Sequence, residues 1–517
     1  MVLMAQLQLS KSDYMLYLKH PAWLWLKKHD KNKLPEVSAD LQAMFDAGHE
    51  FEQYAEAHFP DGVQLGFNNY NEYLDLPART KQTLDDGAKT IFQGRFEHEQ
   101  LTFICDVLRI VGENEVNLYE IKSSTSAKQD HILDLAFQVT VLERCGYSVA
   151  NIYVMHVDNN YVKNGPIDHK RLVATANVTE AVKHELHRTE RNIAAAIEVA
   201  KSSKMPDPSP SGARLGSYKE WLEVYKNITP VPEGSIYELC RLNAGTVKLI
   251  ETEGITKLAE IPEGLVDKKQ QHWQLQAVKQ GSPIIDTEKI AKFIDSLKFP
   301  LYFFDYETLS SCVPYFDGTR PYQQLPFQYS LHVLDSPGSE LRHYSYLHTD
   351  NKPPFEPLSR ALQEQIGSSG SVVAWNMGFE KSCNTAIAKI VPEYEQFYEN
   401  LNSRMVDLML PFSSGHYIDA GFMGSASLKN VLPVLVPELS YKELGIQEGG
   451  AAQRAWMDAV LYEKRTDERE QILADLLQYC ELDTLAMVKI YQYLVEICDD
   501  GKSKHTAKPE QLGIFDE

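Results

Sequence analysis

Two stretches of this chain place charged residues inside runs that otherwise suit a packed β-strand. Residues 118–125 read LYEIKSST, in which Glu120 and Lys122 alternate with apolar residues. Side chains at positions i and i+2 of a strand point to the same face, so a carboxylate and an ammonium group would lie side by side. Buried charges are costly unless they are paired or bound to a metal. The pattern therefore predicts either an ion pair on a half-exposed sheet or a charged site within the sheet.

The second stretch is LYFFDYETL at 301–309, which places Asp305 and Glu307 on one face of a strand. Two neighbouring carboxylates repel each other unless a cation lies between them. Leu301 and the two phenylalanines that follow make this strand look buried, which argues against a solvated acidic pair at a sheet edge. A divalent cation is the simplest explanation.

Length and composition limit the class of protein. A chain of 517 residues predicts two or three domains. We find no apolar run of eighteen residues and no secretion signal at the start, so we expect no membrane partner. The seven cysteines are scattered without a CxxC pair, which favours reduced thiols and a cytoplasmic location. The net charge of −21 argues against a broad basic surface but allows a local basic groove.

The chain divides by pattern into a first block of helices and strands, a connecting part, a second strand-rich block and a tail. The most linker-like segment is 205–217, which is rich in Pro, Ser and Gly. We expect helices within 10–60 and at 127–145 and 178–203, and strands at 101–111, 116–123 and 151–157. The predicted domains are 1–204, 205–295, 296–500 and 501–517.

The first block contains three residues with the chemistry of a metal-dependent site. Asp106 follows the apolar run of the strand at 101–111, and Glu120 and Lys122 lie on the return strand of the same hairpin. Two carboxylates from adjacent strands can bind Mg²⁺, and a lysine beside them can orient water and stabilise developing charge. Glu52 and Glu56, one helical turn apart on a preceding helix, are both candidates to complete the site.

These residues resemble the PD-(D/E)XK nuclease superfamily, in its RecB-like branch, which includes the CRISPR adaptation nucleases. The resemblance covers about residues 10–165. It implies that Asp106, Glu120 and Lys122 form the metal-binding and catalytic triad. It also implies that Gln138, on the following helix, contacts the substrate; Lys128 and His131 flank the site on the same segment.

The first block departs from this family at one point. Relatives of this branch often hold an iron–sulfur cluster through one cysteine near the N-terminus and three cysteines after the core. Here His20, in LKHPAWLWL, occupies the early position, and 205–228 contains no cysteine. We therefore expect no iron–sulfur cluster.

Two later segments add polar residues to the DxE strand. SVVAWNMGFEKS at 371–382 predicts a strand that runs into a helix and carries Asn376 and Glu380. The amphipathic segment 476–494 places Tyr479 and Asp483 at i and i+4, on one face of a helix. Alone, that pair indicates no more than a buried Tyr–Asp hydrogen bond.

The order DxE, NxxFE, YxxxD resembles the DnaQ-like exonucleases with the RNase H fold, in their tyrosine subclass. The resemblance assigns metal binding to Asp305, Glu307, Glu380 and Asp483, with Asp305 also catalytic, and the orientation of the attacking water to Tyr479. The family's third acid is aspartate, so Glu380 is a departure, and Asp407 is a rival for the role.

Substrate contacts are expected from Asn376 and Arg320. Arg320 lies in a loop with alternating aromatic residues, where rings and a guanidinium group suit stacking against single-stranded bases. The alternative is a loop that leads its rings into the core, and Tyr315, Tyr322 and Arg320 stay open between the two.

The whole chain resembles a bacterial family catalogued only as a domain of unknown function, which fuses these two nuclease types. The expected fold is α/β, with an N-terminal restriction-endonuclease-like core and a C-terminal RNase H-like mixed sheet with helices. The expected activity is Mg²⁺- or Mn²⁺-dependent cleavage of DNA, the C-terminal domain acting as a 3′→5′ exonuclease on single-stranded ends. Three alternatives remain: RNA as the substrate, a single active site beside a nucleic-acid-binding domain, and a scaffold in which both sites have decayed.

Overall fold

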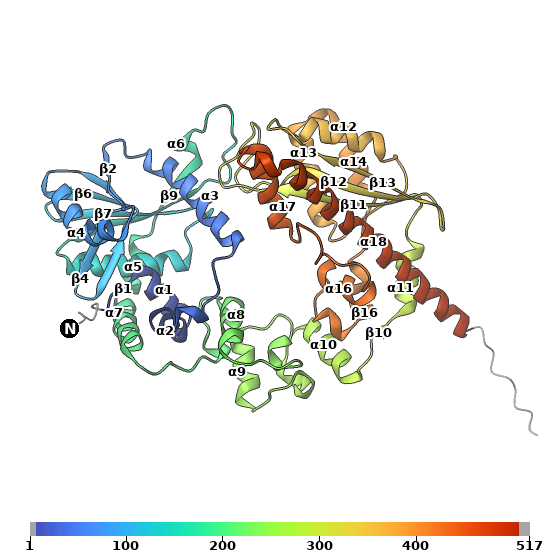
Figure 1. Cartoon of the computed structure of the whole chain (residues 1–517), viewed down its shortest axis with the longest axis horizontal. Helices are drawn as coiled ribbons and strands as arrows, with labels where there is room; N and C mark the ends of the chain where they lie inside the picture. Colours follow the sequence, from blue (N-terminus) through green and yellow to red (C-terminus); the bar gives the residue numbers. More distant parts are fainter. Residues whose placement is uncertain (1–6, 506–517) are drawn as a thin grey trace, which may run out of the picture. The chain divides into compact units, whose positions relative to one another are not determined.

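The computed structural model describes residues 7–505, and these form two compact units (Figure 1). The first unit comprises the chain through Glu233 with Asn243–Leu249 and Ser311–Tyr322. The second comprises Gly234–Leu242, Ile250–Ser310 and the chain from Gln323 onward. Both units combine helices with mixed β-sheets, so the protein is of the mixed α/β class.

The first unit is built on a six-stranded sheet in the order β2-β3-β6-β7-β8-β9. The central strand β7, Glu115–Lys122, runs antiparallel to β6, Val107–Gly112, and parallel to β8, Ser148–Val157. The other strands are β2 (Gly62–Gln64), β3 (Thr90–Phe92) and β9 (Val173–Asn177). Glu120 and Lys122 therefore lie at the end of an interior strand.

The strand predicted at 101–111 is in fact two strands in different sheets. β5, Leu101–Ile104, joins a small sheet with β1 (Leu9–Ser10) and β4 (Arg95–His98), whereas β6 joins the main sheet. The hairpin bends between them, where Cys105 N–H donates to Gly94 O at 2.9 Å. A Cβ at Gly94 would lie 2.6 Å from Ile91 Cδ1, so a larger residue there would displace the end of the Ile91 side chain. Both halves bury apolar side chains, and the hydrophobic pattern alone therefore does not reveal the bend.

Helices cover both faces of the main sheet. α5 (Gln129–Arg144), α7 (Thr179–Lys201), α1 (Lys11–Lys19) and α2 (Pro21–His29) pack together on the face that receives Val116 and Leu118. α3 (Ala39–Glu56) packs on the opposite face, beside Tyr119 and Ile121. The helices predicted at 127–145 and 178–203 are confirmed. The other helices of this unit are α4 (Tyr70–Asp85), α6 (His169–Leu172) and α8 (Tyr218–Ile228).

The second unit is built on a five-stranded sheet in the order β13-β12-β11-β14-β15. β11, Leu301–Leu309, lies at its centre, antiparallel to β12 (Leu325–Leu334) and parallel to β14 (Ser371–Ala374). The outer strands are β13 (Leu341–Leu347) and β15 (Met405–Asp407). The bulge in the β11–β12 pairing falls at Glu307 and Thr308, beside the acidic pair.

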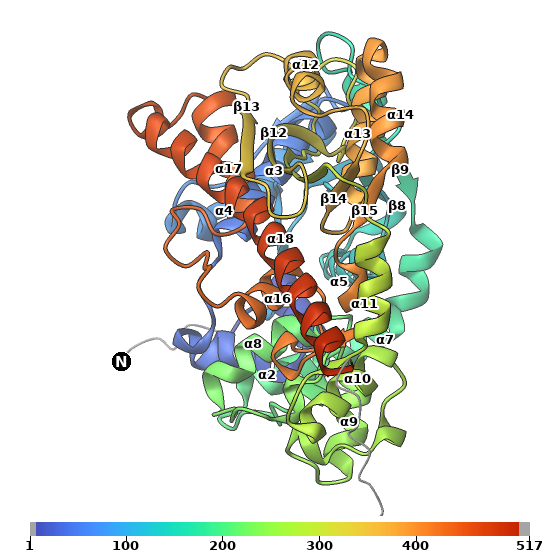
Figure 2. The ribbon, with the colours of Figure 1, turned by 90° about the vertical axis from the view of Figure 1, so that its right-hand side faces the viewer.

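One long helix, α18, Arg469–His505, packs against β11, β12 and β13 (Figure 2). It includes the helix predicted at 476–494 and continues into the predicted tail; residues 506–517 lie outside the described residues.

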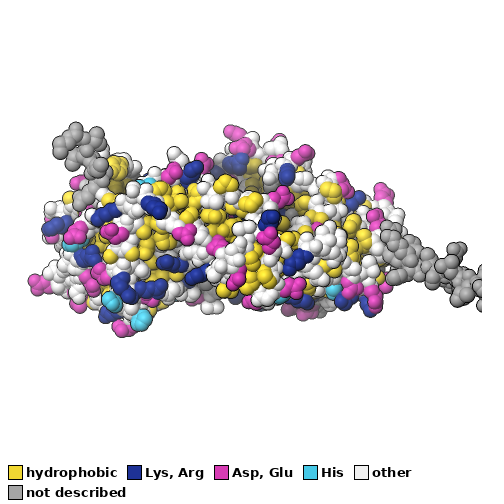
Figure 3. All heavy atoms as spheres, turned by 90° about the horizontal axis from the view of Figure 1, so that it is seen from below, with side chains coloured by type: hydrophobic (Ala, Val, Ile, Leu, Met, Phe, Trp, Pro, Cys, Tyr) yellow, Lys and Arg dark blue, Asp and Glu magenta, His cyan; other side chains and the backbone are white. Residues whose placement is uncertain are grey.

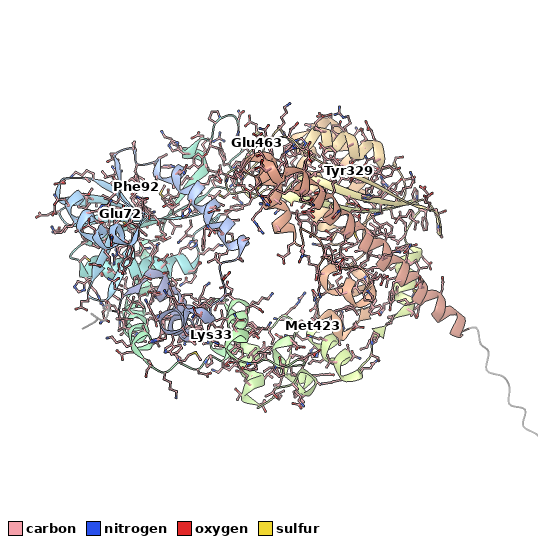
Figure 4. All side chains as sticks on the ribbon, in the orientation of Figure 1. Lys33, Glu72, Phe92, Tyr329, Met423 and Glu463 are labelled. Atoms are coloured by element: carbon pink, nitrogen blue, oxygen red, sulfur yellow. The ribbon has the colours of Figure 1, made fainter. Side chains whose placement is uncertain are left out.

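The opposite face of the five-stranded sheet packs against α12 (Phe355–Gln365) and α13 (Gly378–Ile390). There the hydroxyl of Tyr329, labelled in Figure 4, donates to Gln365 Oε1 of α12 at 2.8 Å. The smaller elements are α10 (Lys269–Gln280), α11 (Thr287–Asp295), α14 (Glu395–Ser403), α15 (Leu410–Ser413), α16 (Leu428–Leu435), α17 (Gly449–Trp456), β10 (Ile284–Ile285) and β16 (Tyr417–Ile418); α9 (Ala244–Thr252) has residues in both units.

Within residues 7–505, the helices are all too short or too polar to cross a lipid bilayer.

The start of the first unit depends on one buried carboxylate, that of Asp13. Ser10 and Asp13 cap α1 reciprocally, the Asp13 carboxylate accepting from Ser10 N at 2.9 Å. Lys28 of α2 donates to the same carboxylate at 2.7 Å, and Lys27 lies 2.9 Å from its other oxygen. Burial opposes ionisation, but the hydrogen bonds from Lys28 and Ser10 lower the pKa of Asp13 to about 2.

Asp13→Asn should lower the free energy of unfolding by about 2 kcal/mol at pH 7, because the substitution removes the charge that the two lysines favour. The folded-state pKa is depressed, so this contribution is present above about pH 4 and fades as the pH falls towards about 2. Urea unfolding of the two proteins at several pH values measures the difference. The control is Asp85→Asn, which breaks an exposed pair with Lys81 and should change stability little. An Asp13→Asn effect no larger than that of the control would contradict this account.

Candidate functional site

The candidate site of the first unit lies at the bend between β5 and β6. The bend places Asp106 beside β7, where its carboxylate accepts from Ile121 N at 2.7 Å. Glu120 is 1% exposed and faces α5, together with the residues of the apolar core on that side. The predicted convergence of Asp106 and Glu120 from adjacent strands thus matches the geometry.

Glu120 is held by three neighbouring side chains. Lys122 and Lys11 lie 2.7 and 3.0 Å from its Oε1, and Gln138 Nε2 donates to its Oε2 at 2.7 Å. Gln138 also donates to Asp134 at 3.1 Å, and Asp134 lies 3.4 Å from Lys122. Two lysines and an amide therefore surround a group of buried carboxylates.

The two lysines divide the carboxyl groups into different charge states. Burial opposes ionisation of Glu120, but the charges of Lys11 and Lys122 hold its pKa below the usual range. Burial and the negative charge of Glu120 raise the pKa of Asp106 to about 7. Glu120 is thus a fixed anion, and Asp106 is the group whose charge an added cation would change most.

Three further predicted residues occupy different positions around this cluster. Glu52 accepts a short hydrogen bond from Gln93 at the bend, and burial raises its pKa. Glu56 lies one turn further along α3, where burial and the charge of Glu52 raise its pKa to about 7. Lys128 is exposed at the start of α5, and its backbone N–H donates to His131 Nδ1 at 3.2 Å. A hydrogen bond thus holds Glu52 at the bend, whereas Lys128 lies on the surface at the start of the helix that carries Asp134 and Gln138.

Lys11 and Asp134 belong to this cluster and were not predicted from the sequence. Lys11 begins α1, more than a hundred residues before Glu120, and no local motif marks it. Asp134 could have been found, because it lies four residues before Gln138 and therefore on the same face of α5.

The position of His20 bears on the expected absence of an iron–sulfur cluster. His20 caps α2 by accepting from Ala22 N at 3.1 Å, so Pro21 starts a new helix. Its Nε2 lies 3.1 Å from Ser209 O, and its ring stacks on Trp221 with centroids 4.1 Å apart. A histidine thus joins the N-terminal helices to the segment around 205–228.

The candidate site of the second unit collects acids from three elements. Asp305 and Glu307 project from β11 towards α18, Glu380 lies in the first turn of α13, and Asp483 lies on α18. The electrostatic neighbours of Asp305 are Asp483, Glu307 and Glu380. The fold therefore brings together the four acids that the sequence predicts.

Their charges are mutually unfavourable. Burial, then the charges of Asp483 and Glu307, raise the pKa of Asp305 well above its usual range, and Glu307 is raised in the same way. Burial raises the pKa of Glu380 to about 8 and that of Asp483 to about 6. Lys429 on α16 is the cation that favours ionisation of Glu307 and Asp483. One lysine facing four acids leaves a surplus of negative charge that a divalent cation would offset.

Two tyrosines contact Asp483. The Tyr441 hydroxyl donates to Asp483 Oδ1 at 2.6 Å, and Tyr479 also hydrogen-bonds this carboxylate. Burial, then the charge of Asp483, raise the pKa of Tyr479 above its usual range, so it is a neutral donor and a poor base. Tyr441 was not predicted; it lies in the chain 42 residues before Asp483, on no shared element.

Glu380 and Asp407 differ in how their oxygens are used. Asp407 Oδ1 accepts from the backbone N–H groups of Asn376 and Met409, both at 3.0 Å. Glu380 is 2% exposed, and its Oε2 has no hydrogen-bond partner among the described residues. Asp407 thus fixes the loop after β14, whereas Glu380 has a free ligand atom inside the cluster.

Arg320 and Asn376, the predicted substrate contacts, fall on different units. Asn376 is exposed at the start of α13, beside Glu380. Arg320 is exposed in Ser311–Tyr322, a segment of the first unit. In the same segment the Tyr322 hydroxyl donates a short hydrogen bond to Ser123 O, close to the end of β7.

Comparison with known proteins matches residues 302–427 to a family model described as a domain of unknown function, DUF2779. The match includes Asp305, Glu307 and Glu380 and ends before Tyr479 and Asp483. Three curated relatives are similar: "Uncharacterized protein MG366 homolog" of Mycoplasma pneumoniae, "Uncharacterized protein MG366" of Mycoplasma genitalium, and "Uncharacterized protein UU173" of Ureaplasma parvum.

These relatives share only part of their length with this chain. The first is 26% identical over 299 residues, which is 54% of this chain and 43% of the relative. The second is 25% identical over 39% of this chain and 33% of the relative, and the third 24% identical over 40% and 33%. The aligned parts thus span less than half the length of each curated relative.

Glu380→Gln should stabilise the metal-free protein while weakening its response to Mn²⁺. The amide keeps the shape of the side chain and removes a carboxyl group whose ionisation burial opposes, so we expect a gain of about 1–3 kcal/mol in the chelator-treated protein. Thermal unfolding with EDTA and with excess Mn²⁺ measures both effects, and Glu395→Gln, exposed on α14, is the control. A loss of stability in EDTA would show that the Glu380 carboxylate is already compensated within the protein.

Proposed function

We propose that this protein is a divalent-metal-dependent nuclease with two separate centres. The first unit would be a PD-(D/E)XK-type nuclease and the second an RNase H-like 3′→5′ exonuclease of the DnaQ type. The observation that carries the proposal is the second cluster: four acids from β11, α13 and α18 converge, burial raises the pKa of each, and repulsion from neighbouring acids of the set raises the pKa of Asp305 and Glu307 further. Such a set is unfavourable as structure alone and suits oxygen-binding Mg²⁺ or Mn²⁺.

The carboxylates of the second cluster fit such ions, because they are buried and oxygen is their donor atom. Asp305, Glu307, Glu380 and Asp483 would hold them. Bound ions would supply stabilisation of the attacking and leaving oxygens of an in-line phosphoryl displacement. The unpartnered Oε2 of Glu380 favours it over Asp407 as the third acid.

The protein's own groups would position the reactants. Tyr479 is 4% exposed and donates within the cluster, so its hydroxyl would orient the attacking water without removing its proton. Lys429 would offset charge on the phosphate that develops during the displacement. In the first unit, Lys122 would orient water beside Asp106 and Glu120, while Gln138 fixes the direction of the Glu120 carboxylate.

A second candidate keeps the hydrolytic function in the second unit only. Glu120 is already compensated by Lys11, Lys122 and Gln138, so the first site has less need of a cation than the second. In that case the first unit would bind nucleic acid without cutting it. RNA remains an alternative substrate in both cases.

Nucleic acid would be held locally rather than by a basic coat. The net charge is −21, and on the face drawn in Figure 3 the basic and acidic side chains are interspersed. Binding would therefore depend on the cations beside each cluster, namely Lys11 and Lys122 in the first unit and Lys429 in the second.

Lys122→Ala and Asp305→Ala should each remove one cleavage pattern and leave the other. Loss of a residue that acts on the transition state should slow its own reaction by about 100- to 1,000-fold. End-labelled DNA and RNA, digested with Mg²⁺ or Mn²⁺, give the two product patterns. The exposed residues Lys81 and Asp335 provide the controls Lys81→Ala and Asp335→Asn. If one variant lost all cleavage while its circular dichroism stayed unchanged, the two centres would not be independent.

Tyr479→Phe, in a Lys122→Ala background, should slow shortening of a 5′-labelled single strand by about 10- to 1,000-fold. The substitution keeps the buried ring and removes only the hydroxyl, so the fold should survive. Tyr491→Phe, a buried tyrosine further along α18, is the matched control and should keep the parental rate. A ladder that shortens from the 3′ end supports the assignment. Immediate release of a labelled mononucleotide, or a ladder unchanged by Asp483→Ala, would refute it.

A further inference from the structure

A cluster of different chemistry lies on the same sheet and begins two residues along β12 from Ser330, the cross-strand partner of Asp305. His332 of β12 and His343 of β13 are direct cross-strand partners, and their rings stack with centroids 4.4 Å apart. Glu481 lies on α18, the helix that packs on this sheet, and its Oε1 lies 3.7 Å from His343 Nδ1. One nitrogen or oxygen of each residue lies within 4.8 Å of the other two. Two imidazoles and a carboxylate from three elements thus point at one another.

Hydroxyl groups lie against one nitrogen of each imidazole. The Thr484 hydroxyl lies 3.1 Å from Glu481 O, 2.8 Å from His332 Nδ1 and 2.7 Å from the Ser330 hydroxyl. The Ser330 hydroxyl in turn lies 2.9 Å from His343 Nε2. When Thr484 donates to Glu481 O, His332 Nδ1 and His343 Nε2 are the protonated nitrogens, and the lone pairs that a metal ion needs are on His332 Nε2 and His343 Nδ1.

We infer that His332, His343 and Glu481 bind a borderline divalent cation such as Zn²⁺. Imidazole nitrogen with one carboxylate is a donor set that Zn²⁺ prefers and Mg²⁺ does not. Two ligands of a tetrahedral Zn²⁺, with bonds of about 2.0 Å, lie about 3.3 Å apart, close to the 3.7 Å between His343 and Glu481. Three protein ligands leave one position for water or another ligand.

The surroundings have two further properties of a metal site. A hydroxyl hydrogen-bonded to the far nitrogen of each ring orients it, as the outer partners of metal-bound histidines do. The cluster is also accessible, since the His343 and Glu481 side chains are 27% and 47% exposed while His332 is buried. A bound ion would link β12 and β13 to α18. The same helix carries Tyr479 and Asp483, two residues before and two residues after Glu481 in the sequence.

The test is Zn²⁺ titration of the chelator-stripped full-length protein in excess Mg²⁺, which saturates the carboxylate cluster but competes poorly for imidazole. The wild-type protein should bind one Zn²⁺ per chain at this site and unfold at a higher temperature when it does. His343→Ala and Glu481→Gln should weaken this binding by more than about 100-fold, and Thr484→Val by about 10- to 100-fold. Asp305→Asn and His187→Ala, an exposed histidine on α7, should leave it unchanged.

Two results would overturn the inference. One is equal Zn²⁺ affinity in the wild-type protein, His343→Ala and Glu481→Gln. The other is loss of the Zn²⁺ in Asp305→Asn, which would assign the ion to the acidic cluster. Thermal unfolding in EDTA checks that each variant folds, and Glu481→Gln, at a partly exposed position, keeps the test valid if His343→Ala does not. Co²⁺ in place of Zn²⁺ gives a second readout, since nitrogen ligation in a low-coordinate site produces visible absorption in the wild-type protein alone.

Discussion

The strongest constraint on the second unit is the repulsion between buried carboxylates on its central strand. Asp305 and Glu307 share one face of β11, and α18 adds Asp483 above them. Burial raises the pKa of all three, and repulsion between the acids raises the pKa of Asp305 and Glu307 further, so folding without a cation carries an electrostatic cost. Other contacts in the unit offset part of this cost. β12, which pairs with β11, is buried along its whole length, and Tyr441, Tyr479 and Lys429 favour the ionised form of Asp483. We regard the cost as the signature of a site built for divalent ions.

In the first unit, lysine side chains offset the charge of the buried carboxylate Glu120. Lys11 and Lys122 contact the same oxygen of Glu120, and Gln138 occupies the other. This balance makes the site stable without a metal and leaves Asp106 as the group most responsive to one. The two units therefore differ in how their buried carboxylates are compensated. Two lysines contact Glu120 in the first unit, whereas Lys429 is the nearby cation for Glu307 and Asp483 in the second. The second unit therefore has the greater electrostatic need for a divalent cation.

Many residues of the two candidate sites could be predicted from the sequence because each site includes a pair of residues on one strand. The two-residue period of a strand placed Glu120 with Lys122 and Asp305 with Glu307, and the i, i+4 spacing placed Tyr479 with Asp483. Contacts between distant segments were not readable: Lys11, Tyr441 and the His332–His343 pair meet their partners only through tertiary packing. The bend at Asp106 was missed for another reason, since apolar residues flank it on both sides and Gly94 lies opposite it in the connection between β3 and β4.

The central claim is that the two acidic clusters are sites for divalent ions. Its most direct test is a crystal structure of the protein grown with Mn²⁺, with anomalous scattering recorded at the manganese edge. The account predicts anomalous density among Asp305, Glu307, Glu380 and Asp483, and a further peak beside Asp106 and Glu120 if the first centre is also hydrolytic. Ordered side chains at Asp305 and Asp483 with no anomalous density between them, at saturating Mn²⁺, would contradict it.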